Sequence, residues 1–286
     1  MQPSRFLRQA DPSALPTPYA RWFIFVEDNL VVLPDGESAR VPDAQTLAEL
    51  GVSPQDSALL GYDEDVPCFL GRLASTELAP PLQAIGLRQA YGLLSERDYG
   101  IAGYAAQIAH WERTTRFCPV CATPTEHDQG ERAKRCPSCD FTQYPRVSPA
   151  IIVLIYREGQ VLLTRQPQWP KGRYSLVAGF VEPGESLEAC VRREVAEEVG
   201  VALADVRYLG SQPWPFPHQL MCGFVARYHD GELAIDTSEL EDAAWFDLDA
   251  LPDLPPPLSI ARRILEWHLA FQSDAQVLFP DDPASV

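Results

Sequence analysis

The chain has 286 residues, which is enough for two domains of ordinary size and a small module. Its 46% hydrophobic and 22% charged residues are typical of a packed globular protein and exclude disorder over the whole chain. The 23 Lys and Arg residues face 40 Asp and Glu, a net charge of −17, which excludes nucleic-acid binding through a general electrostatic surface. No segment has the pattern of a signal peptide or a membrane span, so we expect a cytoplasmic protein.

The first third of the chain predicts a hairpin followed by helix. Apolar runs at Trp22–Val26 and Leu30–Leu33 flank a polar turn, which predicts two paired strands. Apolar residues then recur at helical spacing, so we expect Leu82–Arg113 to be mostly helical. This helical segment leads directly into a group of cysteines.

Four cysteines form two CxxC pairs with 14 residues between them: Cys118, Cys121, Cys136 and Cys139. Thiols stay reduced in the cytoplasm, so clustered cysteines indicate a metal site, and disulfides are the alternative. Two CxxC turns can place four thiolates tetrahedrally around Zn²⁺. Because four sulfurs leave no open coordination position, we expect this zinc to be structural.

The segment around these cysteines escapes the acidic bias of the chain. Trp111–Arg146 carries six basic and five acidic residues, a net charge of +1, whereas the rest carries −18. The charges are either solvated surface groups or a phosphate-binding patch. In the second case Arg132, Lys134 and Arg135 would contact RNA.

The second half of the chain predicts a mixed sheet with helices. Ala150–Tyr156 and Val161–Thr164 read as a buried hairpin, and Tyr174–Phe180 as another strand. A helix is expected at Leu187–Val199, between the N-cap Ser186 and the C-terminal Gly200. Further elements are expected in this order: strands at Val206–Leu209, Leu220–Tyr228 and Ala243–Phe246, and a last helix at Ser259–Phe271. This order has no regular βαβ rhythm, so we predict an α/β fold with helices on the faces of a mixed sheet.

Three glutamates share one face of the helix at Leu187–Val199. At about 100° per residue, Glu194, Glu197 and Glu198 lie within one sector, where like charges repel. A solvated face explains Glu197 but not Glu198, which falls beside the apolar stripe of the helix. Hard divalent cations such as Mg²⁺ are bound by oxygen clusters of this kind, usually together with substrate phosphates.

The chain around this helix resembles the Nudix box, G-x5-E-x7-R-E-U-x-E-E-x-G-U with U aliphatic. The matching residues occupy every fixed position: Gly179, Glu185, Arg193, Glu194, Val195, Glu197, Glu198, Gly200 and Val201. The resemblance implies an α/β/α sandwich and hydrolysis of nucleoside diphosphates linked to another moiety. It also implies metal binding by the helix glutamates and an orienting ion pair between Glu185 and Arg193. Which carboxylate acts as general base stays open.

The stretch Ser211–Pro217, with the sequence SQPWPFP, is similar to a signature of the bacterial NADH pyrophosphatase family, also called NAD-capped RNA hydrolases. On residues alone, its alternating prolines and aromatics predict either a rigid loop that presents a ring or a stiffened core edge. Gln219 stands where the family has a final serine. The resemblance implies a second acidic metal or catalytic position at Glu239, and substrate contacts by Phe180, Gln212, Trp214, Ala261 and Tyr144, the last from a partner subunit.

We therefore expect four parts: an N-terminal α+β domain at 1–110, a zinc ribbon at 111–145, a catalytic Nudix domain at 146–274 and a tail at 275–286. The N-terminal part would be a degenerate Nudix-like domain that supports dimerisation. The resemblance implies hydrolysis of NAD(H) to NMN(H) and AMP, and removal of the NAD cap from RNA 5′ ends. The expected enzyme is a homodimer that uses Mg²⁺ or Mn²⁺ at Glu194, Glu198 and Glu239.

Two other functions stay open. One is a broader ADP-ribose or dinucleotide pyrophosphatase, which the loop around Trp214 disfavours. The other is a non-catalytic zinc-ribbon RNA-binding protein, which the intact glutamates disfavour. The sequence does not choose between free NADH and capped RNA as the main substrate.

Overall fold

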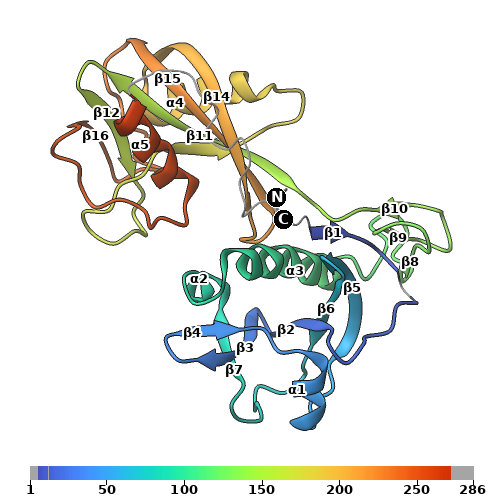
Figure 1. Ribbon diagram of the computed structural model, residues 1–286. Coiled ribbons are helices and arrows are strands. Elements are labelled where there is room, and N and C mark those ends of the chain that lie inside the picture. Colours follow the sequence, from blue (N-terminus) through green and yellow to red (C-terminus); the bar gives the residue numbers. More distant parts are fainter. Residues whose placement is uncertain (1–5, 12, 272–286) are drawn as a thin grey trace. The chain divides into compact units, whose positions relative to one another are not determined.

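The computed structural model describes residues 6–11 and 13–271, so the expected tail at 275–286 lies outside the described residues. The chain forms two compact units (Figure 1). Unit 1 contains the described residues up to Arg146 together with Pro215–Pro217, and unit 2 contains Val147–Trp214 and the described residues from His218 onward. No helix of the described residues combines the length and apolarity that crossing a membrane requires.

Unit 1 is built on a seven-stranded sheet in which β2 and β6 are parallel neighbours and the other pairs are antiparallel. The expected hairpin is confirmed, since β2 and β3 pair around the turn at Glu27-Asp28. In spatial order the strands are β1 (Phe6–Arg8), β5 (Gln55–Asp63), β6 (Val66–Arg72), β2 (Arg21–Val26), β3 (Asn29–Asp35) and β4 (Ser38–Arg40), with β7 (Gln83–Gly86) paired to β3.

The segment expected to be helical from Leu82 to Arg113 is divided into three elements. It begins as strand β7, continues as the single-turn helix α2 (Leu87–Ala90) and becomes the long helix α3 (Glu96–Thr114) only after Ser95. The Ser95 hydroxyl caps α3 by accepting a hydrogen bond from the Asp98 N–H. Pairing of β7 with β3 overrides the helical periodicity of this stretch. The remaining helix of unit 1 is α1 (Ala44–Glu49).

The cysteine segment forms a small antiparallel sheet within unit 1. Its strands are two residues each, in the order β10 (Thr142–Gln143), β9 (Lys134–Arg135) and β8 (Glu126–His127). A tight turn at each CxxC pair leads into or out of these strands, as the spacing predicts for a zinc ribbon.

Unit 2 is built on a six-stranded mixed sheet in which β11 and β15 are parallel and the other pairs antiparallel. The spatial order is β14 (Ala202–Trp214), β15 (Gln219–Asp230), β11 (Ser148–Arg157), β12 (Gln160–Arg165) and β16 (Asp242–Asp247), with β13 (Val177–Phe180) paired to β11. The expected strand at Tyr174–Phe180 is thus shorter than predicted. The expected hairpin is confirmed, and Gly159, with φ of +70°, makes its turn.

Two helices cover opposite faces of the unit 2 sheet (Figure 1). Helix α4 (Leu187–Val199) packs with Ile151, Val153 and Ile155 of β11. Helix α5 (Ile260–Phe271) packs with the alternate residues, Ile152 and Leu154. Side chains alternate between the faces of a strand, so β11 contributes to both cores. This arrangement confirms the α/β/α sandwich with a mixed sheet.

The motif Ser211–Pro217 spans the end of a strand and the turn after it, which agrees with a stiffened edge better than with an extended loop. Residues up to Trp214 belong to β14, and Pro215–His218 form the turn into β15. Pro213 fits here because β14 is the edge of the sheet within the described residues, where a missing N–H breaks no inner ladder.

Candidate active site

Helix α4 begins and ends where its capping residues predicted. The hydroxyl of Ser186 accepts a hydrogen bond from the Ala189 N–H at 3.1 Å. Gly200 follows the last helical residue with φ of +73°, a left-handed conformation that glycine adopts without steric cost. These two ends set the register in which Glu194 and Glu198 are buried.

Arg193 connects three carboxylates at the N-terminal side of the site. Its guanidinium binds both oxygens of Glu185, at 2.8 and 2.9 Å, which confirms the expected ion pair. It also donates to Glu194 at 2.8 Å, to Glu197 at 3.0 Å and to the carbonyl of Phe180 at 3.0 Å. The hydrogen bonds from Arg193 lower the pKa of Glu185 to about 2, so this carboxylate is ionised.

Burial separates the three Nudix-box glutamates of α4. Glu194 and Glu198 are 9% and 5% exposed, whereas the side chain of Glu197 is 61% exposed. Burial, reinforced by the negative charges of Glu194, Glu239 and Asp236, raises the pKa of Glu198 to about 8. Burial also raises the pKa of Glu194, against the opposing effect of its arginine.

Gly179 of β13 makes room for the carboxylate of Glu194. A Cβ atom at this position would lie about 2 Å from all three carboxylate atoms, far inside contact distance. The first glycine of the Nudix box therefore allows helix α4 to place an acidic group directly against the backbone of the sheet.

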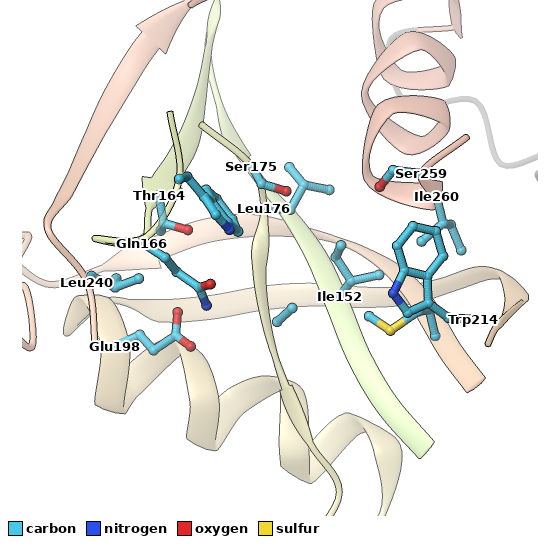
Figure 2. A pocket seen from close by; sticks show the side chains of 13 residues that line it. Ile152, Thr164, Gln166, Ser175, Leu176, Glu198, Trp214, Leu240, Ser259 and Ile260 are labelled. Carbon is cyan, nitrogen blue, oxygen red and sulfur yellow. The ribbon is translucent and has the colours of Figure 1, made fainter. Parts of the chain in front are cut away.

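A cavity of 160 Å³ in unit 2 extends from Glu198 past the sheet to Trp214. Figure 2 shows Glu198 and Gln166 at one end and Trp214 at the other. Its other walls are mainly apolar and come from β11, β12, β13, β15, the start of α5 and the loops before β13 and β16 and after β12. These residues are Ile152, Thr164, Trp169, Ser175, Leu176, Ala178, Met221, Leu240, Ser259 and Ile260.

The predicted substrate-contact residues are only partly brought to this cavity. Trp214 lines it. Gln212 does not: its buried amide donates to the carbonyl of Leu258 at 3.0 Å and accepts from the Ile260 N–H at 2.9 Å. These two bonds use the amide to hold the start of α5, which gives Gln212 a structural role, and its contact with substrate stays a prediction.

The backbone of Ala261 is also engaged within the protein. Its N–H donates to the Ser259 hydroxyl at 3.2 Å, and the residue is buried under the sheet. The neighbours Ser259 and Ile260 line the cavity in its place. Phe180 is 52% exposed, and its carbonyl is held by Arg193.

Two further predicted residues lie outside the cavity lining. Glu239 is exposed in a turn, but its charge acts on Glu194 and Glu198. Tyr144 belongs to unit 1, is exposed, and donates its hydroxyl to Glu131 at 2.9 Å. The metal or catalytic role of Glu239 and the substrate role of Tyr144 stay predictions.

The four cysteines of unit 1 converge as a metal site requires. Their sulfur atoms lie within 4.8 Å of one another, with separations of 3.4 to 3.6 Å for three pairs. Tetrahedral coordination with Zn–S bonds of 2.3 Å implies S–S separations of about 3.8 Å, so the donor set fits Zn²⁺. The contact with the Thr123 hydroxyl lowers the pKa of Cys121 to about 6, which favours the thiolate.

A left-handed residue follows each CxxC pair. Ala122 and Asp140 have φ of +60° and +59°. Their N–H groups bond back to the carbonyls of Cys118 and Cys136, at 2.9 and 3.0 Å, and close the two turns. Aspartate tolerates the left-handed conformation better than most residues, which explains its place after the fourth cysteine.

Two of the three cations of the expected RNA-binding patch are engaged within unit 1. The guanidinium of Arg132 donates to the carbonyls of Gln9 and Leu59, at 2.6 and 2.8 Å. Lys134 is buried and pairs with Glu112 at 2.7 Å. These two cations stabilise the ribbon against the rest of unit 1, and of the three only Arg135 lies on the surface, beside Asp128.

Three residues near the site were not predicted from the sequence. Gln166 and Trp169 come from a loop after β12, and Asp236 from a turn after β15. The signal for Trp169 was a tryptophan within a polar, proline-containing loop, where an aromatic ring has no local partner. Gln166 and Asp236 carried no such signal.

Comparison with known families agrees with this geometry. The model of the NUDIX domain matches residues 146–268. The N-terminal part matches an NADH pyrophosphatase-like rudimentary NUDIX domain at 19–111, and the cysteine segment matches an NADH pyrophosphatase zinc ribbon domain at 113–144. The class is therefore that of the Nudix hydrolases.

Curated relatives show to which family of Nudix hydrolases the chain belongs. An NAD-capped RNA hydrolase NudC of Pseudomonas aeruginosa (strain LESB58) is 44% identical over 252 residues, which cover 88% of this chain and 87% of the relative. An NAD-capped RNA hydrolase NudC of Deinococcus radiodurans is 43% identical over 258 residues, or 88% and 89% of the two chains. A Nudix hydrolase crystal structure from Nitrosomonas europaea matches with 22% identity and a TM-score of 0.48, over 56% of this chain and 96% of that one. On the relatives' identity and coverage, this chain belongs to the NudC family.

Proposed function

We propose that this protein hydrolyses the pyrophosphate bond of NAD(H), giving NMN(H) and AMP, and removes the NAD cap from RNA 5′ ends. The observation that carries the proposal is the buried carboxylate of Glu198 in a cavity that Trp214 also lines. Acidic oxygens at one end and an aromatic ring at the other suit a diphosphate joined to a flat base. The names of the two NudC relatives support the same substrate.

A divalent cation, Mg²⁺ or Mn²⁺, belongs to the proposal. No described residue donates a hydrogen bond to the carboxylate of Glu198, although it is almost fully buried. A buried carboxylate needs a compensating cation, and clustered oxygens suit hard metals. Glu194, Glu198 and Glu239 would hold the ion, with Glu197 beside them. When bound, it offsets the charge of the phosphates and lowers the pKa of a water molecule.

The chain's own groups orient the site and accept the proton. Arg193 fixes the carboxylates of Glu185 and Glu194 through short hydrogen bonds. An ionised glutamate of α4 takes the proton of the attacking water, the usual role of a carboxylate base. The ring of Trp214 holds the base of the dinucleotide, and the apolar walls of the cavity exclude bulk water.

The test is hydrolysis of NADH by the full-length protein with Mg²⁺ or Mn²⁺. We expect NMNH and AMP as products, and a kcat/KM for NADH at least about tenfold above that for ADP-ribose. Equal values would favour the broader pyrophosphatase, and no hydrolysis of either would refute the proposal. NAD-capped RNA with a single-stranded 5′ end, assayed beside RNA with a paired end, tests cap removal.

Dimerisation and compartment are also part of the proposal. Exposed apolar side chains of Phe117, Val120 and Tyr144 in unit 1 support a homodimer in which Tyr144 reaches the partner's site. Sedimentation velocity tests this state. The free thiols of the described cysteines support a reducing, cytoplasmic location. The boundaries at 110, 145 and 274 stay predictions.

A further inference from the structure

Unit 1 contains a cavity of 730 Å³ that the proposed reaction does not use. Its walls come from the turn between β2 and β3, the end of β6, helices α2 and α3, and Pro215–Pro217. This volume is in the range of sites that hold nucleotides and other small ligands. Pro215 directly follows Trp214, which lines the cavity of unit 2.

Arginines dominate the charge of this cavity in an otherwise acidic chain. Arg72, Arg88 and Arg113 line it, against the carboxylates of Glu27 and Asp28. Its lining thus carries an excess of positive charge, whereas the whole chain carries −17. This local positive charge attracts anions, whereas the acidic surface of the rest of the chain repels them.

Two of the arginines are available to an anion. Arg72 is the half-buried last residue of β6, and its guanidinium makes no hydrogen bond or ion pair with the described part of the chain. Arg113 pairs with Asp28 at 2.8 Å, but the two side chains are 41% and 82% exposed. Exposed pairs contribute little net stability, so Arg113 can exchange Asp28 for a phosphate.

An aromatic surface lies beside these charges. The guanidinium of Arg88 stacks over the ring of Phe216 at 3.8 Å. Apolar side chains of Leu87, Ala106 and Ala109 continue the wall. Aromatic and guanidinium planes stack nucleobases with little demand on sequence.

We propose that this cavity binds a nucleotide unit, with its phosphate at Arg72 and Arg113 and its base against Phe216 and Arg88. The unit is either a free mononucleotide or part of a single-stranded RNA. If the ligand is RNA, the inference rests on the proposed cap removal. The cavity of unit 1, and not the cations of the ribbon, would then bind the RNA chain.

Direct binding tests the site without turnover. The full-length protein is titrated in EDTA with a 3′-fluorescent oligoadenylate of about ten nucleotides bearing a 5′-hydroxyl, and separately with AMP. We expect the double variant R72Q/R113Q to weaken oligonucleotide binding by at least about tenfold and to reduce the salt dependence by about two charges. The matched control R40Q/R227Q removes two exposed cations outside the cavity and should bind like the wild type.

A free mononucleotide and a single-stranded RNA give different results in this experiment. Loss of oligonucleotide binding with unchanged AMP binding identifies RNA, and loss of AMP binding alone identifies a free mononucleotide. The exposed single variant R88A repeats the test if R72Q/R113Q melts at a lower temperature than the control. If neither variant changes the binding of either probe, or if the control loses as much, the proposal is overturned. NADH hydrolysis by the same preparations reports the proposed function independently and should be unchanged.

Discussion

Gly179 and Glu194 share one space: a Cβ atom on the glycine would lie 1.9 Å from the carboxylate carbon of the glutamate and 2.1 and 2.2 Å from its oxygens. The contact joins the first position of the Nudix box to its helix. The acidic side chain on α4 lies against the backbone of β13. A residue larger than glycine at position 179 would therefore overlap Glu194 in its present position.

Replacing Gly179 with alanine should therefore displace Glu194 and lower kcat by about 10²-fold, the effect of a misplacement of about 1 Å. Steady-state kinetics with NADH measure this loss. Gly130→Ala is the matched control, because its Cβ would lie 3.7 Å from the nearest atom. Full activity of Gly179→Ala would show that Glu194 does not need its present position.

Glu198→Gln should lower turnover by about 10²–10³-fold, the range seen on loss of one electrostatic contribution to a transition state. The change keeps the shape of the side chain and removes one charge from the acidic cluster. Glu188→Gln alters an exposed glutamate at the start of the same helix and should leave kcat unchanged. Near-normal turnover of Glu198→Gln at saturating metal would remove this residue from the proposed site.

The metal-free protein should lose stability as the pH rises from about 4.5 to about 8. The pKa of Glu198 is raised from 4.5 to about 8 by burial, so in this window the folded state binds more protons than the unfolded state. The stability that protonated Glu198 contributes is present in full below its ordinary pKa of 4.5. It is lost as the pH rises through the folded-state pKa of about 8. Thermal melting in EDTA at several pH values measures this trend.

Added Mg²⁺ should raise the melting temperature more at high than at low pH, because carboxylate ligands must be deprotonated. In Glu198→Gln the fall with pH should be shallower and the effect of Mg²⁺ smaller. A wild-type protein whose melting temperature in EDTA rises from pH 6 to pH 8 would contradict the assignment of a buried, protonated Glu198.

Cys136→Ser should lower zinc content and melting temperature together, because metal binding energy is folding energy in small zinc modules. Elemental analysis and thermal melting are the measurements. Cys222→Ala, in the core of unit 2, should keep its zinc. A Cys136→Ser protein that lost zinc but kept its melting temperature and activity would show that the ribbon is dispensable.

Gln212→Leu should destabilise the protein by about 2–4 kcal/mol, since two buried backbone groups, at Leu258 and Ile260, lose their partner. Denaturant unfolding measures the change. At temperatures where the variant is folded, KM for NADH should stay near the wild-type value. A raised KM without loss of stability would instead indicate that Gln212 contacts the substrate.

The sequence predicted the features that depend on local chemistry. Ser186 and Gly200 marked the ends of α4 because caps satisfy backbone groups within one turn. The ion pair of Glu185 and Arg193 followed from the Nudix box. The CxxC spacing predicted the sulfur cluster of unit 1, which needs only two turns and a connecting hairpin.

Features that depend on tertiary contacts were not predictable. Strand β7 looked helical in sequence, but it pairs with β3, more than 50 residues earlier. The cations Arg132 and Lys134 looked like a surface patch, although they bond to carbonyls and a glutamate of unit 1. Gln212 gave no sign that its amide is engaged by the backbone of Leu258 and of Ile260 at the start of α5, 46 and 48 residues away.

The proline-rich end of β14 has a consequence for self-association. A long edge strand offers unpaired backbone groups on which a second molecule can add a strand, the first step of many aggregates. Within the described residues β14 is such an edge, and it spans 13 residues. Pro213 lacks the N–H that an incoming strand would need, and the register shifts between Ala202 and Gly210 interrupt its regular spacing. The strand that carries Trp214 therefore also keeps the sheet from growing beyond one molecule.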